Sequence, residues 1–415
     1  MLFNIAIASI WHRKFVVALT IISIAISVVV VLAVEHIRVQ AKQSFTSTLS
    51  DTDLIVGARG GQINLLLYSV FRIGNAANNI SWQSYETIAQ QKGVKWTIPI
   101  SLGDSHKGYR VLATDSNYFT HYRYSEKRPL MFSVGNPFNG VYEVVLGSEV
   151  ARKLHYRLGD KIILSHGVSE VSFTQHDDKP FTVTGILKPT GTPVDQTLHI
   201  NLAGMEAIHI DWKNGAPLSS LKIDAETALK QDLTPKTITA FLVGLDNKIM
   251  TFRLQRQINE FRGEPLMAIL PGVALSELWQ IMGMIEKLLL LIAGLVVLAA
   301  LLGMTTMTLS TLKQRQKEIM LLRTIGAPTY FIVGLIQLEA ILIAATGIIV
   351  GIAVLWLSLL ASQLWISSTV GIHLNTNPLT LNTLAYCISI LLITVILAAI
   401  PSAIAYRQAH LEIGS

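Results

Sequence analysis

Five histidines could do chemistry here, because they gather in one stretch of the sequence. They are His155, His166, His176, His199 and His209, and two acids, Asp177 and Asp178, follow His176 directly. Imidazole and carboxylate groups hold Zn²⁺ or Cu²⁺ when three of them meet. The spacing matches no ligand motif, so scattered surface or core histidines are the favoured interpretation. A metal site made of His166, His176 and Asp178 is the alternative.

Other reactive motifs are missing from the sequence. No glycine is followed by lysine, which excludes the GxxxxGK[ST] phosphate loop and hence ATP hydrolysis by an ordinary P-loop in this chain. HExxH, CxxC and GxSxG do not occur either. Cys387, the only cysteine, lies in an apolar run and can form no intramolecular disulfide. We therefore predict a non-catalytic chain that binds no cofactor directly.

Glu339 is a single carboxylate inside a long apolar run. Such a group is costly in a membrane and is by default a functional candidate. It follows Pro328 by 11 positions, which favours a place near the cytoplasmic interface. One carboxylate makes no proton relay, so we predict a structural role through a hydrogen bond or an ion pair.

A block from Arg315 to Gly326, RQKEIMLLRTIG, combines basic residues with four consecutive apolar ones, Ile319 to Leu322. Successive residues of a helix point about 100° apart, so no single solvated face can hold these four. Gly326 suits a helix C-terminus and Pro328 the first turn of the next helix. A basic loop that only sets topology would not need the apolar residues. The block predicts a short, largely enclosed helix on which another protein pushes.

The composition is that of a membrane protein: 51% hydrophobic residues, 14% charged residues and a mean hydropathy of +0.48. Four long runs with at most one charge each can cross a bilayer at ~20 residues per crossing. They are Phe15–Val34, Leu288–Leu312, Tyr330–Trp356 and Leu379–Tyr406. The net charge of +6 does not indicate nucleic acid, because the basic residues form no run interleaved with aromatics.

The distribution of lysine and arginine predicts the topology. Arg13 and Lys14 precede the first run and four basic residues lie in 313–323, whereas the loop 361–378 has none. By the positive-inside rule, both termini and the 313–323 loop face the cytoplasm. The first run is longer than a signal-peptide core of roughly 7 to 15 residues, so we predict a retained span.

Two helical stalks are expected to flank a large outer domain. Glu35, Arg38 and Lys42 recur at helical spacing, which extends the first helix to about Leu49. After Pro271 and Gly272, Ser276 is placed to cap a helix that runs without a breaker into the second span.

Within the outer domain, strand and helix patterns alternate, which predicts a mixed α+β fold, in one or two lobes. Strands are expected at Glu143–Leu146, Lys161–Leu164, Phe181–Leu187 and Ile238–Leu245, and helices from a Ser148 cap to Leu154, at Leu202–His209 and at Lys248–Phe261. Asp53–Ser81 predicts a strand, a turn and a short amphipathic helix packed in the domain. A helix on the membrane surface, or one lining a lateral opening, is the alternative.

The stretch RQKEIMLLRTIGAPTYFIVGLIQLEAILIAATGIIVG resembles the signature of the FtsX-like and MacB-like permease domain of ABC transporters. The matching residues are Glu318, Ile319, Leu321, Leu322, Arg323, Gly326, Ala327, Glu339, Ala340, Gly347 and Gly351. The ending, through Pro401, Ala405 and Ala409, and the outer stretch VLGSEVARKLHYRLGDKI are similar too. The resemblance is strong over the first span and residues 276–415, and weaker in the rest of the outer domain.

The resemblance implies a permease that works with a separate cytoplasmic ABC ATPase dimer, which uses ATP and Mg²⁺. The ATPase-coupling residues would be Arg315, Glu318, Ile319, Leu321, Leu322, Arg323 and Gly326. A second permease protomer, identical or related, would flank the same ATPase. Nucleotide-driven closure would move the stalks and the outer domain, a mechanism called mechanotransmission, rather than open a channel. The implied location is the bacterial inner membrane, crossed several times, with lipids and a periplasmic protein or lipoprotein as further partners.

The expected fold is therefore membrane α-helical, with four transmembrane helices and a large mixed α+β extracytoplasmic domain between the first and the second. The expected segments are 1–14 (cytoplasmic), 15–36 (first span), 37–275 (periplasmic domain with stalks), 276–312 (stalk and second span), 313–327 (coupling helix), 328–360 (third span), 361–378 (periplasmic loop), 379–406 (fourth span) and 407–415 (cytoplasmic tail).

Three functions compete for this architecture. The leading one is the membrane subunit of an ABC system that acts on a lipoprotein, lipid, peptide or amphiphile of the envelope. The alternative is a signalling subunit in which the same movements activate a periplasmic hydrolase and nothing is transported. A channel or ion-coupled transporter is disfavoured, because its pathway would need more polar residues within the spans than Glu339 alone.

Overall fold

The computed structural model describes residues 2–167, 176–213, 216–217, 223–314, 320, 324, 327–369, 377 and 380–411. The chain divides into two compact units. We call them the helical unit (1–41, 282–365 and 374–415) and the sheet unit (42–281 and 366–373).

The helical unit is built from five helices in the part of the chain that the structure describes. They are α1 (Leu2–His12), α2 (Lys14–Ser47), α10 (Pro271–Gln314), α12 (Thr329–Thr369) and α13 (Leu381–Leu411). The last four are long and apolar enough to cross a membrane, over Lys14–Gln40, Pro271–Leu312, Thr329–Ser362 and Leu381–Arg407. The predicted fold class, four spanning helices with a mixed domain between the first and the second, is confirmed.

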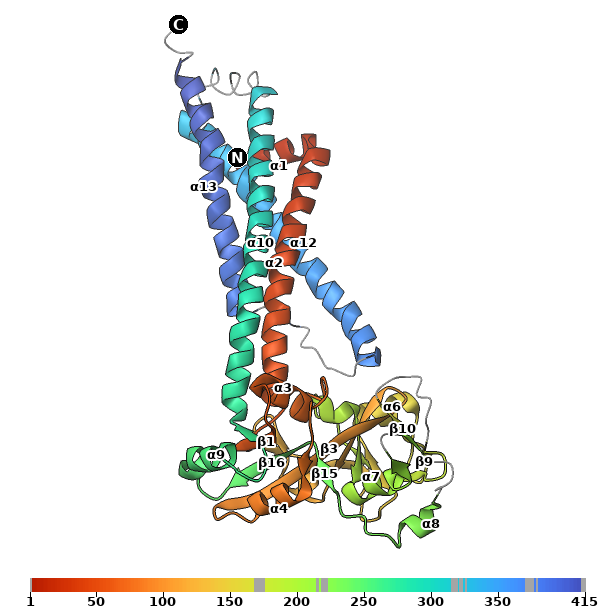
Figure 1. The fold of residues 1–415 in the computed structure, drawn as a ribbon. Helices are drawn as coiled ribbons and strands as arrows, with labels where there is room; N and C mark the ends of the chain where they lie inside the picture. The colour runs from red at the N-terminus through yellow and green to blue at the C-terminus, as the bar shows by residue number, and fades with distance from the viewer. Residues whose placement is uncertain are drawn as a thin grey trace. The chain divides into compact units, whose positions relative to one another are not determined.

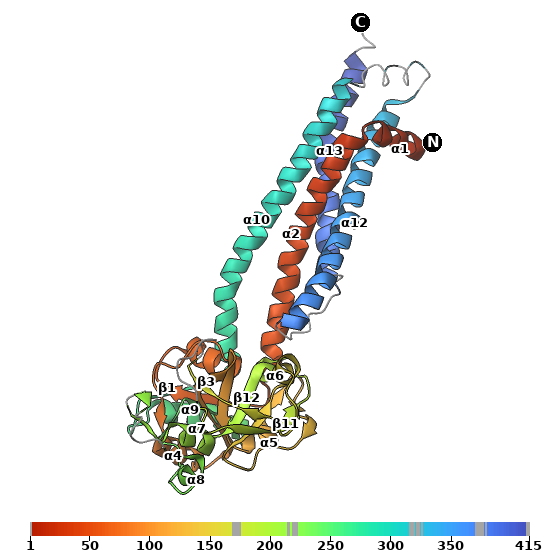
Figure 2. The same ribbon diagram turned by 90° about the vertical axis from the view of Figure 1, so that its right-hand side faces the viewer.

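The four long helices pack along one another through a shared apolar core (Figures 1 and 2). Ile24 and Val28 of α2 belong to this core with Leu301 of α10, Ala344 of α12 and Ile390 of α13. Their other sides expose large apolar residues such as Leu19, Leu291, Ile349 and Leu392. Apolar side chains on both sides are what a helix between protein and lipid requires. In both views α1 lies at the same end of this bundle as the end of α10 and the start of α12.

The sheet unit is a mixed α+β domain. Its strands are β1 (Leu54–Ala58), β2 (Ile80–Ser81), β3 (Val94–His106), β4 (Tyr109–Thr114), β5 (Arg123–Tyr124), β6 (Arg128–Pro129), β7 (Phe132–Gly135), β8 (Glu143–Leu146), β9 (Lys161–Ile162), β10 (Ser165–His166), β11 (Phe181–Leu187), β12 (Thr197–Asn201), β13 (Trp212–Lys213), β14 (Ala216–Pro217), β15 (Thr237–Ile238), β16 (Ala240–Leu245) and β17 (Leu266–Ile269). Its helices are α3 (Gln62–Leu66), the π-helix η1 (Leu67–Phe71), α4 (Trp82–Ala89), α5 (Asn117–His121), α6 (Ser148–Leu154), the 3₁₀ helix η2 (Pro193–Gln196), α7 (Leu202–His209), α8 (Ala225–Ala228), the 3₁₀ helix η4 (Lys248–Met250) and α9 (Thr251–Asn259).

Most of the strands form one sheet in the order β17-β1-β16-β3-β4-β12-β8-β11-β7, with β10 on β3 and β9 on β11. The long strand β3 is shared: Val94 to Ile100 pairs with β16, and Ser101 to His106 pairs with β4. The β4–β12 and β8–β11 pairs are parallel and the other pairs of this sheet are antiparallel. β3 therefore joins two parts of one continuous sheet.

The sheet is buried on both faces because its strands alternate between two apolar cores. Leu54 and Val56 of β1 face one core, which also contains Ile88 of α4, Ile208 of α7 and Ile258 of α9. Strand residues whose side chains point to the other face of the sheet, such as Ile55 and Leu242, pack in a second core with α3, η1 and α5. Successive side chains of a strand point to opposite faces, so strands that are apolar throughout need cover on both sides.

Several elements lie where their patterns predict them. β8, β11 and α7 have the expected bounds, and α2 reaches Ser47, close to the expected Leu49. The segment after β1 forms α3 and η1, whose residues Leu65, Tyr68 and Phe71 are buried in the second core. This confirms the packed helix.

Other local predictions were wrong. Ser148 is the first residue of α6, and Gly147 takes the capping position. α10 begins at Pro271, so Ser276 lies inside the helix instead of capping it. A proline ring already has the backbone angle of a first helical turn, which lets the helix begin five residues earlier. β9 ends at Ile162, because the chain leaves its partner β11 there and pairs with β3 at Ser165.

Candidate functional site

The predicted ATPase-coupling residues lie outside the described residues. They are Arg315, Glu318, Ile319, Leu321, Leu322, Arg323 and Gly326. The structure describes the helices on either side of this block: α10 ends at Gln314 and α12 begins at Thr329. A movement of the block would therefore act first on these two helices, and their contacts with α2 are the candidate site.

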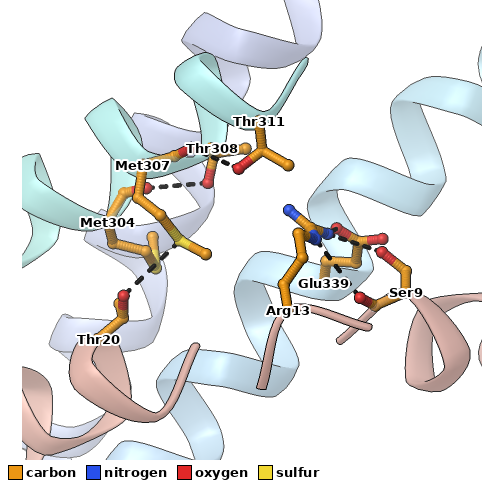
Figure 3. A network of polar contacts seen from close by, with 8 residues as sticks. All are labelled: Ser9, Arg13, Thr20, Met304, Met307, Thr308, Thr311 and Glu339. Carbon is orange, nitrogen blue, oxygen red and sulfur yellow. Dashed lines mark hydrogen bonds and ion pairs between the residues drawn. The ribbon is translucent and has the colours of Figure 1, made fainter. Parts of the chain in front are cut away.

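Glu339 of α12 is paired with Arg13, which lies between α1 and α2 (Figure 3). Arg13 Nη2 is 2.9 Å from Glu339 Oε2 and also donates to Ser9 Oγ at 2.7 Å. The exposed fractions of the two charged side chains are 20% and 7%. Because an apolar environment penalises separated charges, this pair ties the start of α2 to α12.

Two glycines of α12 let it approach α2 closely. A Cβ atom on Gly347 would come within 2.8 Å of Ile24 Cγ2, and one on Gly351 within 2.9 Å of the Ala25 carbonyl oxygen. Small residues four apart at a helix interface allow two membrane helices to come this near. Gly347 and Gly351, two of the matching residues noted in the sequence, thus form a contact surface for α2.

The hydroxyl contacts between α2 and α10 are long. Thr20 Oγ1 lies 3.6 Å from Met307 Sδ (Figure 3). Ser27 Oγ lies 3.4 Å from the Val296 carbonyl oxygen. The hydroxyls of Thr308 and Thr311 instead donate to carbonyls of their own helix. Around Thr20 and Ser27, apolar packing therefore supplies most of the contact between these two helices.

A second group of charges lies further along α2. Arg38 bridges Glu35 of its own helix, at 3.0 Å, and Glu286 of α10, at 2.6 Å. Glu35 is 2% exposed and accepts a hydrogen bond from Asn382 of α13 at 2.8 Å. These side chains connect three helices. α2 is therefore joined to α12 by Arg13 and to α10 and α13 by Glu35 and Arg38.

The histidines of the sheet unit are only partly gathered. His166 and His176 lie beside Asp104 of β3 and His209 of α7. Asp178 does not join them, because it pairs with Lys179 at 3.2 Å. His155 is exposed after α6, whereas His199 is buried and donates from Nδ1 to the Val145 carbonyl oxygen. Burial lowers the pKa of His199 to about 3, so it is a neutral core residue.

The pKa values of the residues in this cluster shift in different directions. Burial disfavours the charged form of Asp104, but hydrogen bonds with His166 and His209 outweigh it and lower the Asp104 pKa to about 2. Burial lowers the pKa of His176 to about 4. Burial also opposes a charge on His209, yet its hydrogen bond with Asp104 raises the His209 pKa. The cluster holds one carboxylate anion among three imidazoles.

Sequence reasoning missed Arg13 as the partner of Glu339 and Asp104 as the centre of the histidine cluster. Each lies far along the chain from its partner, 326 positions for Arg13 and Glu339 and 62 for Asp104 and His166. Asp104 carries one local signal, an acid in a strand that also holds Ile98, Ile100 and Leu102. That signal becomes informative only when the strand is known to be buried.

Two family models match this chain. A MacB-like periplasmic core domain matches residues 17–240, more than half of the sequence. An FtsX-like permease C-terminal region matches residues 290–410. Both matches confirm the resemblance noted from the sequence. No curated protein matches the chain.

Two solved structures are similar to it. The periplasmic region of MacB from Actinobacillus actinomycetemcomitans is 11% identical, with 56% of this chain and 94% of that chain covered and a TM-score of 0.33. The extracellular domain of the noncanonic ABC-type transporter YknZ from Gram-positive bacteria is 13% identical, with 52% and 98% covered and a TM-score of 0.30. At these TM-scores the assignment depends on the family models alone.

Proposed function

Because this chain belongs to the FtsX-like and MacB-like family of ABC transporter permeases, we propose that it couples ATP hydrolysis by a separate cytoplasmic ATPase dimer to movements of its periplasmic domain. It would act by mechanotransmission on a lipoprotein, lipid, peptide or amphiphile of the envelope. The proposed location of the chain is the bacterial inner membrane, with both termini in the cytoplasm. A second permease protomer would lie beside this chain.

The observation that carries the proposal is the position of α2. The coupling block lies between α10 and α12, and α2 contacts both helices. A push on the block would reach α2 through Arg13–Glu339 and the Gly347 and Gly351 contacts.

From there the movement would travel along the chain itself. α2 and α10 are single unbroken helices of 34 and 44 residues, each running from one unit into the other. A helix resists bending, so displacement of its membrane part would be felt by the sheet unit.

The test uses the full-length chain purified in lipid nanodiscs with its co-purifying ATPase. Leu322→Glu places a charge among the apolar residues of the block, and Thr324→Ser in the same block serves as the matched control. We expect Leu322→Glu to reduce ATPase retention and the ATP hydrolysis of the complex at least about tenfold, a change of roughly 1.4 kcal/mol in coupling.

Normal membrane insertion of both variants separates lost coupling from lost folding. No co-purifying ATPase with the unaltered chain, or full retention and hydrolysis with Leu322→Glu, would refute the proposed coupling.

A further inference from the structure

The cluster around Asp104 brings four potential metal ligands together from separate parts of the sheet unit. Asp104 lies on β3, His166 on β10 and His209 on α7, and His176 precedes β11. Asp104 and His176 are buried, while the side chains of His209 and His166 are 24% and 43% exposed. The cluster is thus enclosed at Asp104 and His176 and open to solvent at His166 and His209, where an ion could enter.

The distances between the donor atoms match those of a tetrahedral ion. His166 Nδ1 is 3.1 Å from Asp104 Oδ1 and 3.3 Å from His209 Nε2, and His209 Nε2 is 3.5 Å from Asp104 Oδ1. Ligands about 2.0–2.1 Å from a tetrahedral Zn²⁺ stand about 3.3 Å apart. Adjacent ligands of a square-planar Cu²⁺ would stand only about 2.8 Å apart, so the spacing favours zinc.

His176 supplies a fourth donor. Its Nε2 atom lies 4.0 Å from Asp104 Oδ2, and the donor atoms of Asp104, His176 and His209 all lie within 4.8 Å of one another. His176 would therefore have to move toward the other donors to complete a four-ligand shell at normal Zn–N distances.

The hydrogen bonds of His209 fix its tautomer in the form that binds a metal. Its Nδ1 atom lies 2.9 Å from the Met205 carbonyl oxygen, which can only accept, so Nδ1 carries the proton. This leaves Nε2, which lies 3.5 Å from Asp104 Oδ1, as the ring atom that could bind a metal. A histidine that donates from its second nitrogen to a backbone carbonyl is the usual arrangement around a metal ligand.

His166 Nδ1 faces both Asp104 Oδ1 and His209 Nε2. A metal ion among these three atoms would take all of them as ligands.

We propose that Asp104, His166, His176 and His209 form a Zn²⁺-binding site in the periplasmic domain. Bound zinc would join β3, β10 and α7 through one ion, in addition to the side-chain contacts that already link them. Asp178, which the sequence suggested as a ligand, is replaced by Asp104 because Lys179 holds the Asp178 carboxylate.

The experiment uses the full-length chain in detergent micelles, stripped of metal with a chelator. Zn²⁺ affinity is measured by competition with a chromogenic chelator, and Co²⁺ absorption reports four-coordinate geometry. The variants are His209→Gln and His166→Gln. His155→Asn is the matched control, because His155 is exposed and has a positive φ of 58°, which asparagine tolerates.

We expect one Zn²⁺ per chain, a four-coordinate Co²⁺ spectrum, and affinity at least about tenfold weaker in both cluster variants. His155→Asn should bind as the unaltered chain does. His166 is partly exposed, so His166→Gln keeps the test valid if His209→Gln fails to fold.

Absence of Zn²⁺ binding, or equal affinity in the unaltered chain and His166→Gln, would overturn the site and leave a protonated His209 as the explanation of the cluster. Neither result depends on the ATPase, so the site and the proposed coupling can fail separately.

Discussion

The two units of the chain use buried charges in different ways. In the helical unit, Arg13 meets Glu339 on a helix 326 positions away, among helices that are apolar on nearly every side. In the sheet unit, Lys179 is 1% exposed and pairs with Asp211, 32 positions away, beside a sheet whose alternating strands already specify its packing.

This difference shows that the two units use polar contacts for different purposes. A helix that is apolar all round can pack on several faces, so ion pairs and glycines must select its neighbours. A strand with alternating side chains has its two faces assigned by geometry. Polar groups in the helical unit therefore specify packing, whereas some in the sheet unit can serve binding.

The largest stability effect is expected at Lys179. Lys179→Met removes the cation that neutralises Asp211 and Asp178, leaving a buried carboxylate without its partner. We expect a loss of about 3–5 kcal/mol in the free energy of unfolding. Chemical denaturation of the full chain in mixed micelles measures it.

Lys153→Met is the control, because its partner Glu149 keeps a second ion pair with Arg152. It should cost less than about 1 kcal/mol. Equal losses in the two variants would show that the burial of Lys179 has no special role.

A double-mutant cycle at Arg13 and Glu339 tests whether the helical unit needs its ion pair for stability or only for selecting neighbours. Arg13→Met or Glu339→Leu alone should cost about 2–3 kcal/mol, since each leaves one charge in apolar surroundings. The double variant should recover most of this loss, because an apolar pair suits the same place. Thermal unfolding in micelles measures all four proteins, and an additive double loss would contradict the idea.

The smallest effect concerns the contact of β1 with α3 and η1. A Cβ at Gly57 would stand 2.6 Å from Leu65 Cδ1 and 2.7 Å from Tyr68 Oη, so Gly57→Ala should cost about 1–3 kcal/mol. Gly103→Ala, on β3 with open space around the added carbon, is the control and should change stability little. Equal midpoints of thermal unfolding for the two variants would mean that α3 and η1 do not pack firmly on β1.

Local patterns predicted much of the fold. The alternation of Phe181–Leu187 and the helical spacing of Leu202–His209 gave the bounds of β11 and α7, because each pattern matches the periodicity of one kind of element. The start of α10 was misplaced at Ser276, because capping preference competed with a proline five residues earlier. Two neighbouring signals of this kind are hard to rank without the structure.

The sequence predicted only some of the residues in the histidine cluster. His166 and His176 could be named from the residue types, but Asp178 was chosen because it is adjacent in sequence. The chain turns after His176, with the Lys179 N–H donating to the His176 carbonyl oxygen, and Asp178 pairs with Lys179. Asp104 and His209 join the cluster only because β3, β10 and α7 converge in space.

The sequence by itself determined that this protein has four spanning helices, a large mixed domain between the first two and the family signature at Glu318 to Gly326, because hydropathy and periodicity act over short stretches of chain. Only the tertiary structure decided that α2 contacts α10, α12 and α13, that Arg13 neutralises Glu339, and that Asp104 gathers three histidines. Those contacts join residues tens to hundreds of positions apart, and their partners are selected by the packing of the whole unit.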